Sequence, residues 1–192
     1  GSYGYYRASA DGSLYTNAWY SDYNNSYYYG EDAKRSTGLQ TIDGIQYLFD
    51  ASGTLAVSRM VVLANVNYYC DTNGAAHEMP NNQWYKGDDG NWYYVKDGEV
   101  LKECTAQIDG KWYFFRPGGL MAKGWINPEY GKWYYMLEDG TMVTGWLRIG
   151  DDYYFMRGDG SMGTGWREMD GAWYYFQENG KCVVNAWAQI QD

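Results

Sequence analysis

One spacing of tryptophans limits what this chain can fold into. Trp125, Trp146, Trp166 and Trp187 are separated by 21, 20 and 21 residues. A fixed period of this length is typical of a repeat architecture, in which each copy buries apolar surface only against its neighbours. We therefore expect one small structural unit repeated along the chain, rather than a domain with a single central core.

The same register extends toward the N-terminus, where non-aromatic residues take the place of some tryptophans. Steps of 20 to 24 residues back from Trp125 complete a series of nine anchor positions, the others being Thr105, Trp84, Met60, Leu39 and Trp19. An aromatic cluster such as Trp133-Tyr134-Tyr135 follows each anchor after seven or eight residues. A turn glycine follows each cluster, except in the second copy, where Lys34 stands.

Short turn signals lie between anchor and cluster, as in Asp43-Gly44, Asp109-Gly110 and Asp170-Gly171. Asp-Gly between two short segments rich in aromatic residues favours a β-hairpin, because both turn residues must tolerate positive φ. A single hairpin is marginally stable in water, so the copies must stack. The sequence predicts an all-β fold, a β-hairpin repeat solenoid of about nine ~20-residue repeats. We expect one continuous solenoid, with degenerate repeats in residues 1–83 and well-formed repeats in 84–192.

Composition excludes several classes of function. The net charge of −9 would repel a nucleic-acid backbone and favours cationic groups as partners. The 23 Tyr and 10 Trp outnumber the 5 Phe, so most rings carry a polar atom and suit half-wet positions. No run of 18 apolar residues predicts a membrane span. The cysteines have no zinc-ligand spacing and predict neither a metal site nor a disulfide framework; they are Cys70, Cys104 and Cys182.

Catalytic chemistry finds little support in the sequence. His77 is the only histidine, and Cys70 lies in a cluster position where other copies have an aromatic ring, so we interpret Cys70 as structural. We expect no catalytic residues and no cofactor. The chain begins Gly1-Ser2 without Met, which indicates a segment of a longer protein whose catalytic region, if there is one, lies elsewhere.

The segment from Trp125 to Trp187 reads as GW, six or seven residues, WYY, and then a stretch close to DGxMxTGW. It resembles the cell-wall-binding repeat family, the choline-binding modules of bacterial surface proteins and lysins. The stretch TGLQTIDGIQYLFDASGTLA, from Thr37 to Ala56, is more similar to the related repeats of glucan-binding domains and clostridial toxins. The resemblance implies a non-catalytic module, secreted and attached to the bacterial cell surface, that binds choline on teichoic acids or, in the related branches, sugar chains.

The resemblance also implies where the ligand sits. In choline-binding members it lies between consecutive hairpins, walled by the anchor tryptophan and a cluster ring of one repeat and a cluster ring of the next, often with a methionine. Ring faces attract a quaternary ammonium through cation–π interaction, and such a cation has no hydrogen-bond donor to offer. Three sets of walls are complete: Trp84, Trp92 and Trp112; Trp125, Trp133 and Tyr153, with Met142; and Trp146, Tyr153 and Trp173, with Met162.

The remaining junctions are incomplete. Trp166 and Trp173 start a further set for which no following repeat is present. The anchors Thr105, Leu39 and Met60 are not tryptophans, so their junctions lack the first aromatic wall. Gln46 removes a wall from the junction after Trp19. We therefore expect a largely structural N-terminal half.

Other interpretations of the same rings stay open. Aromatic rows at strand spacing are often packing, and the methionines could equally fill gaps in the stack. Glucan or another glycan could stack on the same rings, or the array could be a structural stalk that forms a homodimer.

Overall fold

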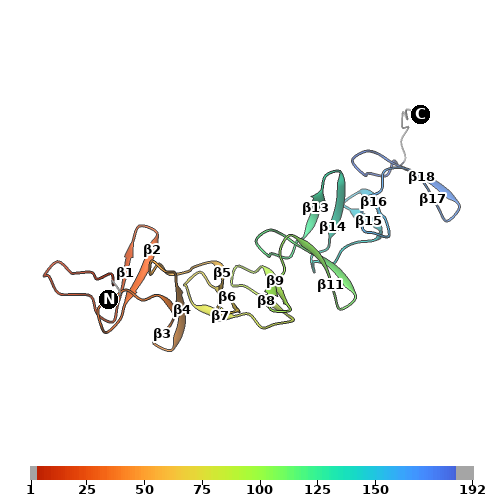
Figure 1. Cartoon of the computed structure of the whole chain (residues 1–192). Coiled ribbons are helices and arrows are strands. Elements are labelled where there is room, and N and C mark those ends of the chain that lie inside the picture. Colours follow the sequence, from red (N-terminus) through yellow and green to blue (C-terminus); the bar gives the residue numbers. More distant parts are fainter. Residues whose placement is uncertain (1–3, 185–192) are drawn as a thin grey trace. The chain divides into compact units, whose positions relative to one another are not determined.

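The computed structural model describes residues 4–184, and every regular element in that range is a β-strand (Figure 1). Eighteen strands in this range form eight small antiparallel sheets, and an isolated bridge between Ala8 and Leu14 marks one more copy before them. The prediction of an all-β hairpin repeat solenoid is confirmed. No helix within residues 4–184 has the length and apolar character needed to cross a bilayer.

The chain divides into two compact units, Gly1–Leu101 and Lys102–Asp192, called here the N-terminal and C-terminal units. The strands of the N-terminal unit are β1 (Ala18–Asp22), β2 (Asn25–Tyr29), β3 (Gly38–Ile42), β4 (Ile45–Phe49), β5 (Arg59–Leu63), β6 (Val66–Cys70), β7 (Ala76–Glu78), β8 (Gln83–Lys86), β9 (Trp92–Lys96) and β10 (Glu99–Val100). Those of the C-terminal unit are β11 (Cys104–Ile108), β12 (Lys111–Phe115), β13 (Gly124–Glu129), β14 (Lys132–Met136), β15 (Gly145–Ile149), β16 (Asp152–Met156), β17 (Gly165–Met169) and β18 (Ala172–Phe176). The predicted change in repeat quality at residue 84 stays a prediction.

Two-residue turns close the hairpins where the sequence predicts them. Asp109 and Gly110 have φ of 49° and 78°, and Asp170 and Gly171 have 51° and 77°. Positive φ at both positions matches the right-handed twist of the flanking strands. Each anchor pairs with a residue of its own cluster: the second residue in the first three hairpins, as Trp19 does with Tyr28, and the third in the later ones, as Trp125 does with Tyr135.

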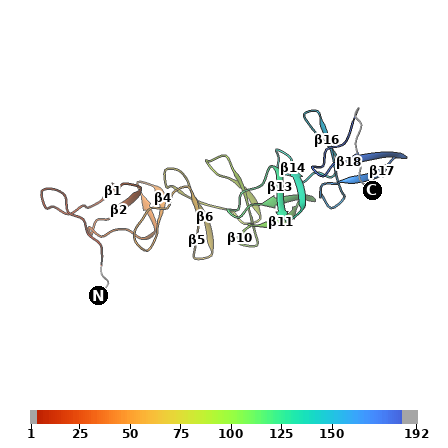
Figure 2. The same ribbon diagram turned by 90° about the horizontal axis from the view of Figure 1, so that it is seen from above.

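Loops bind each hairpin to the one before it. The N–H of Met162, in the loop after β16, donates to the carbonyl of Trp133 in β14 at 2.7 Å. Met142 and Cys182 make the equivalent bonds to Trp112 and Tyr153, at 2.8 and 2.7 Å. The backbone therefore fixes the spacing of successive hairpins in the C-terminal unit, which follow one another along the chain in Figures 1 and 2.

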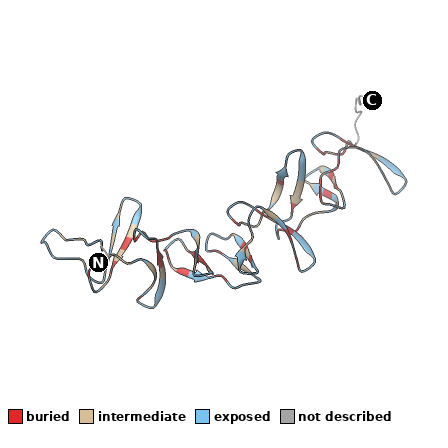
Figure 3. Cartoon of the chain, viewed as in Figure 1, coloured by how far each residue is buried: buried red, intermediate tan, exposed pale blue. Residues whose placement is uncertain are grey.

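The buried residues are spread along the chain in successive copies instead of forming one central mass (Figure 3). In the C-terminal unit the last residue of each second hairpin strand is fully buried; these residues are Phe115, Met136, Met156 and Phe176. This distribution is expected of a repeat fold, where each copy completes its core against its neighbours.

The second copy differs from the sequence prediction at its loop turn. The turn position aligned with the glycines is Ala33, not Lys34: its N–H donates to the Gly30 carbonyl, and its φ is 61°. Sequence spacing alone missed this shift because the left-handed position of this loop holds alanine, not glycine.

Candidate functional site

Strand alternation places the aromatic rings of each hairpin on two opposite faces. Side chains two apart in a strand share a face. In the hairpin of β13 and β14, Trp125, Trp133 and Tyr135 share one face, with ring centroids of Trp133 and Tyr135 lying 6.4 and 5.1 Å from that of Trp125. Met136, on the other face, is fully buried. The first face is therefore left for the next hairpin to cover.

The next hairpin contributes a fourth ring. Tyr154, in β16, lies with its ring centroid 5.0 Å from that of Trp125, at an interplanar angle of 64°. Together these side chains form a cleft of about 410 Å³, which we call the Trp125 cleft. Its lining residues are Trp125, Trp133, Tyr154, Met162, Glu178, Asn179 and Lys181.

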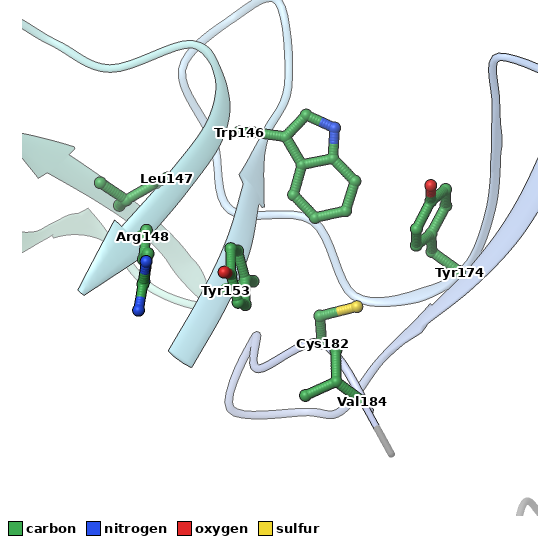
Figure 4. A pocket seen from close by; sticks show the side chains of 7 residues that line it. All are labelled: Trp146, Leu147, Arg148, Tyr153, Tyr174, Cys182 and Val184. Carbon is green, nitrogen blue, oxygen red and sulfur yellow. The ribbon is translucent and has the colours of Figure 1, made fainter. Parts of the chain in front are cut away.

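One repeat later the arrangement recurs. Trp146 lies 5.0 Å from Tyr174 between ring centroids, and Tyr153 lines the same cleft of about 370 Å³, which we call the Trp146 cleft. The other lining residues are Leu147, Arg148, Cys182 and Val184. Figure 4 shows the indole of Trp146, the ring of Tyr174 and the sulfur of Cys182 bordering a common space.

These rings are not sealed inside the protein. Trp133 is 44% exposed, Trp146 is 45% exposed and Tyr153 is 36% exposed. These three rings are therefore partly open to solvent.

Charged side chains line part of both clefts and make contacts of their own. The Nζ of Lys181 is 2.7 Å from the Asp152 carboxylate, and that hydrogen bond raises the pKa of Lys181. The guanidinium of Arg148 lies 5.4 Å from the centroid of the Tyr153 ring, while its Nε donates to the Gly150 carbonyl. Burial raises the pKa of the Cys182 thiol, so this wall is uncharged at neutral pH. The rest of each lining is mostly aromatic and apolar.

Three segments of the chain match known families of repeats. Residues 105–144 and 143–187 match a family described as a choline-binding repeat, and residues 81–101 match one described as a cell wall binding repeat. These matches cover more than half of the chain. Residues 105–187 are therefore choline-binding repeats, preceded by a cell wall binding repeat in residues 81–101. The chain is a cell-wall-binding module, as the sequence resemblance indicated.

Individual relatives of these choline-binding repeats are of two kinds. Glucosyltransferase-S of Streptococcus mutans serotype c is 36% identical over 103 residues, which are 53% of this chain and 7% of the glucosyltransferase. The crystal structure of choline binding protein F from Streptococcus pneumoniae, in the presence of a peptidoglycan analogue, has a TM-score of 0.56 at 30% identity and covers 85% of this chain and 57% of that chain. CbpJ from Streptococcus pneumoniae TIGR4 gives 0.51 at 27% identity, with coverage of 93% and 61%. The chain spans less than two thirds of each relative.

The structure groups the predicted walls of these choline-binding repeats differently at one position. Trp125 and Trp133 do lie together, but the ring that joins them is Tyr154, not Tyr153. Likewise, Trp146 and Tyr153 are joined by Tyr174, not Trp173. The reason is alternation: in β16 and β18 the second cluster ring faces back toward the preceding hairpin, and the first faces forward.

The sulfur-bearing walls are shifted by one repeat. Met162 lines the Trp125 cleft, where the sequence predicted Met142, and Cys182 lines the Trp146 cleft, where it predicted Met162. Met142 instead packs against the buried cluster that holds Ile126 and Met136. Each of these loop residues is bonded to the hairpin before its own, so it serves the earlier junction.

Two further predicted sets are described only in part. Trp84 and Trp92 meet at 6.3 Å between ring centroids in the N-terminal unit, whereas Trp112 belongs to the C-terminal unit, so this set stays a prediction. Trp166 and Trp173 meet at 6.4 Å. Trp187, which closes the sequence repeat, lies outside the described residues.

The junction after Trp19 is incomplete for another reason than the one predicted. Tyr47 lies 4.9 Å from Trp19 between ring centroids, so the ring of the following repeat is present and Gln46 removes nothing. The missing wall is at Ser26, which stands where Trp133 stands in the Trp125 cleft.

Sequence reasoning missed several lining residues. Strand alternation could have found Tyr154 and Tyr174, because the middle ring of a cluster must face opposite to its flanks. Glu178, Asn179 and Lys181 come from the loop two hairpins beyond Trp125. No local pattern marks that approach, which depends on how the loops fold back.

Proposed function

We propose that this chain is a non-catalytic cell-surface attachment module, carried on a secreted bacterial protein, that holds choline groups of teichoic acid-type wall polymers in the Trp125 and Trp146 clefts. The observation that carries the proposal is the meeting of three rings from two consecutive hairpins around Trp125, with Trp133 half exposed. Such a box is repeated at Trp146.

The chemistry of the clefts favours a quaternary ammonium guest. Each ring face within reach of a cation contributes roughly 0.5–2 kcal/mol, depending on how far water is excluded. The Trp125 cleft is lined by three rings and Met162, and Glu178 is among its other lining residues. The net charge of −9 adds a long-range attraction for a cationic polymer substituent.

Two weak sites on one module suit a polymeric ligand. When both clefts engage groups on the same polymer, the second contact forms at a high effective concentration and the overall affinity exceeds that of either cleft. A wall polymer with repeated choline groups meets this condition, whereas free choline does not.

Titration with free choline, followed by tryptophan fluorescence, tests the proposal. We expect a saturable change in wild-type protein and a cleft affinity that is about 2- to 30-fold weaker in Trp133→Leu, which corresponds to the loss of one ring face. Trp133→Phe keeps a ring at the same position and should retain most of the binding. Tyr130→Ala is the matched control, because Tyr130 is fully exposed at the tip of the same hairpin.

A flat choline titration of the wild-type protein would contradict the proposal. An equal response of Trp133→Leu and Tyr130→Ala would show that choline binds elsewhere.

Glycan recognition is the second candidate, favoured by the 36% identity to Glucosyltransferase-S of Streptococcus mutans. Ring faces that attract a cation also stack on the apolar face of a sugar. Retention of the chain on an immobilised α-glucan, with no fluorescence response to choline, would support this function over the first.

A further inference from the structure

The first junction of the N-terminal unit holds a charged side chain where other junctions hold an apolar one. The loop residue that bonds back to the preceding hairpin is Leu55, Met142, Met162 or Cys182 at other junctions. At the first junction it is Arg35, whose N–H donates to the carbonyl of Tyr5 at 2.9 Å. Arg35 therefore occupies the position at which Met162 lines the Trp125 cleft.

The guanidinium of Arg35 lies among three tyrosine rings. Its Cζ is 4.1 Å from the ring centroid of Tyr27, 5.1 Å from that of Tyr5 and 5.8 Å from that of Tyr29. All three distances lie within the range of about 6 Å for cation–π attraction. Tyr27 and Tyr29 are buried, whereas Tyr5 is 65% exposed, so water screens the attraction little on the side of Tyr27 and Tyr29 only.

Two of the rings around Arg35, those of Tyr5 and Tyr27, hold the same register positions as walls of the Trp125 cleft. Tyr5 accepts the loop hydrogen bond as Trp133 does, and Tyr27 pairs across its hairpin as Tyr154 does. The guanidinium of Arg35 thus takes the position that an external guest would take in the Trp125 cleft.

Polar contacts anchor only two of the three guanidinium nitrogens. One Nη donates to the Ser52 carbonyl at 3.0 Å and the other to the Tyr29 hydroxyl at 3.2 Å. The Nε is buried without a hydrogen-bond partner among the described residues. Gly53 leaves room for the side chain, because a Cβ there would lie 2.2 Å from the Arg35 Cδ.

We propose that this junction is a cation cage whose guest is the chain's own Arg35. Removal of the guanidinium leaves a site for small organic cations of the guanidinium or tetraalkylammonium class. In the wild-type protein the captured side chain clamps the hairpin of β1 and β2 to the copy before it and keeps external cations out. This proposal does not depend on choline binding in the C-terminal unit.

Chemical rescue tests the cage directly. Arg35→Ala is titrated with tetramethylammonium and, separately, with methylguanidinium, while NMR follows the ring signals of Tyr27. We expect a saturable shift of these signals in Arg35→Ala and none in wild-type protein. Arg35→Met supplies the apolar side chain found at other junctions and is the second variant, in case truncation to Ala unfolds the hairpin. Arg59→Ala, which removes an exposed arginine of the same unit, should behave as the wild type does.

The stabilising effect of the captured Arg35 side chain is measured separately, by thermal unfolding. Arg35→Ala and Arg35→Met should lower the thermal midpoint of the N-terminal unit, and tetramethylammonium should raise it again in Arg35→Ala, with no comparable gain in Arg59→Ala.

The cage proposal would be overturned if the Tyr27 ring signals did not shift with added cation in either Arg35 variant, or if they shifted equally in wild-type protein. Either result leaves the proposed function intact if the indoles of Trp125 and Trp146 still respond to choline. Conversely, a Tyr27 response with silent indoles supports the cage and removes choline from the proposed function.

Discussion

At the scale of single residues, the loop methionines and the turn glycines depend on each other. Gly160 has a φ of +82°, and a Cβ at this position would lie 2.2 Å from the Sδ of Met142. The same relation holds between Gly140 and Met121 and between Gly180 and Met162. A glycine is required here for two independent reasons, its left-handed backbone and the close approach of the preceding loop.

Gly160→Ala should therefore destabilise the C-terminal unit more than a substitution that meets only the backbone requirement. Gly171 has a φ of +77° with open space around it, so Gly171→Ala is the control and should cost about 1–2 kcal/mol. Gly160→Ala should cost a further 1–3 kcal/mol or so, because Met142 must leave its place. Urea unfolding followed by circular dichroism measures both. Equal losses would mean that the loop yields without strain.

At the scale of elements, strand alternation decides which cleft each ring serves. Tyr153 and Tyr154 are neighbours in β16, yet Tyr154 closes the Trp125 cleft and Tyr153 lines the Trp146 cleft. One hairpin therefore presents one ring to the junction before it and the next ring to the junction after it. A repeat of about 20 residues can therefore contribute lining rings to two successive clefts.

Substitution of the two neighbours should separate the clefts. Tyr154→Leu should weaken the choline response of the Trp125 indole about 2- to 30-fold and spare that of Trp146, and Tyr153→Leu should do the reverse. Indole Nε1–H signals in NMR spectra of ¹⁵N-tryptophan-labelled protein report each cleft. In each variant the unaffected cleft serves as the internal control of folding. Loss of both responses in Tyr153→Leu would contradict the assignment of that ring to one cleft.

At the scale of the whole molecule, ligand sites are distributed unevenly. Both clefts described above lie in the C-terminal unit. In the N-terminal unit Ser26 takes the place of a wall after Trp19, and Arg35 fills the first junction. Because repeat stability is a sum of local terms, a ligand should stabilise the copies that hold it and leave distant copies unchanged.

Hydrogen exchange with and without choline checks this distribution. A ligand that binds only the native state stabilises it by about 2.7 kcal/mol at 100 times its dissociation constant. We expect slower exchange of the amides in residues 124–182 and no change in residues 18–71. Protection that rises equally in both ranges would show that the units respond together.

The sequence by itself determined the repeat, the hairpins and their turns, because these depend on local periodicity and on the conformational preferences of Asp-Gly pairs. It also determined that Trp125 and Trp133, or Trp146 and Tyr153, share a face, since residues of one hairpin are related by fixed strand geometry. Strand alternation also selects Tyr154 and Tyr174 as the rings that the following hairpins contribute. The tertiary structure decided which sulfur completes each cleft, and that Arg35 fills the first junction. Those contacts join residues of different hairpins, whose approach is set by how each loop folds back, and no local pattern in the chain encodes that approach.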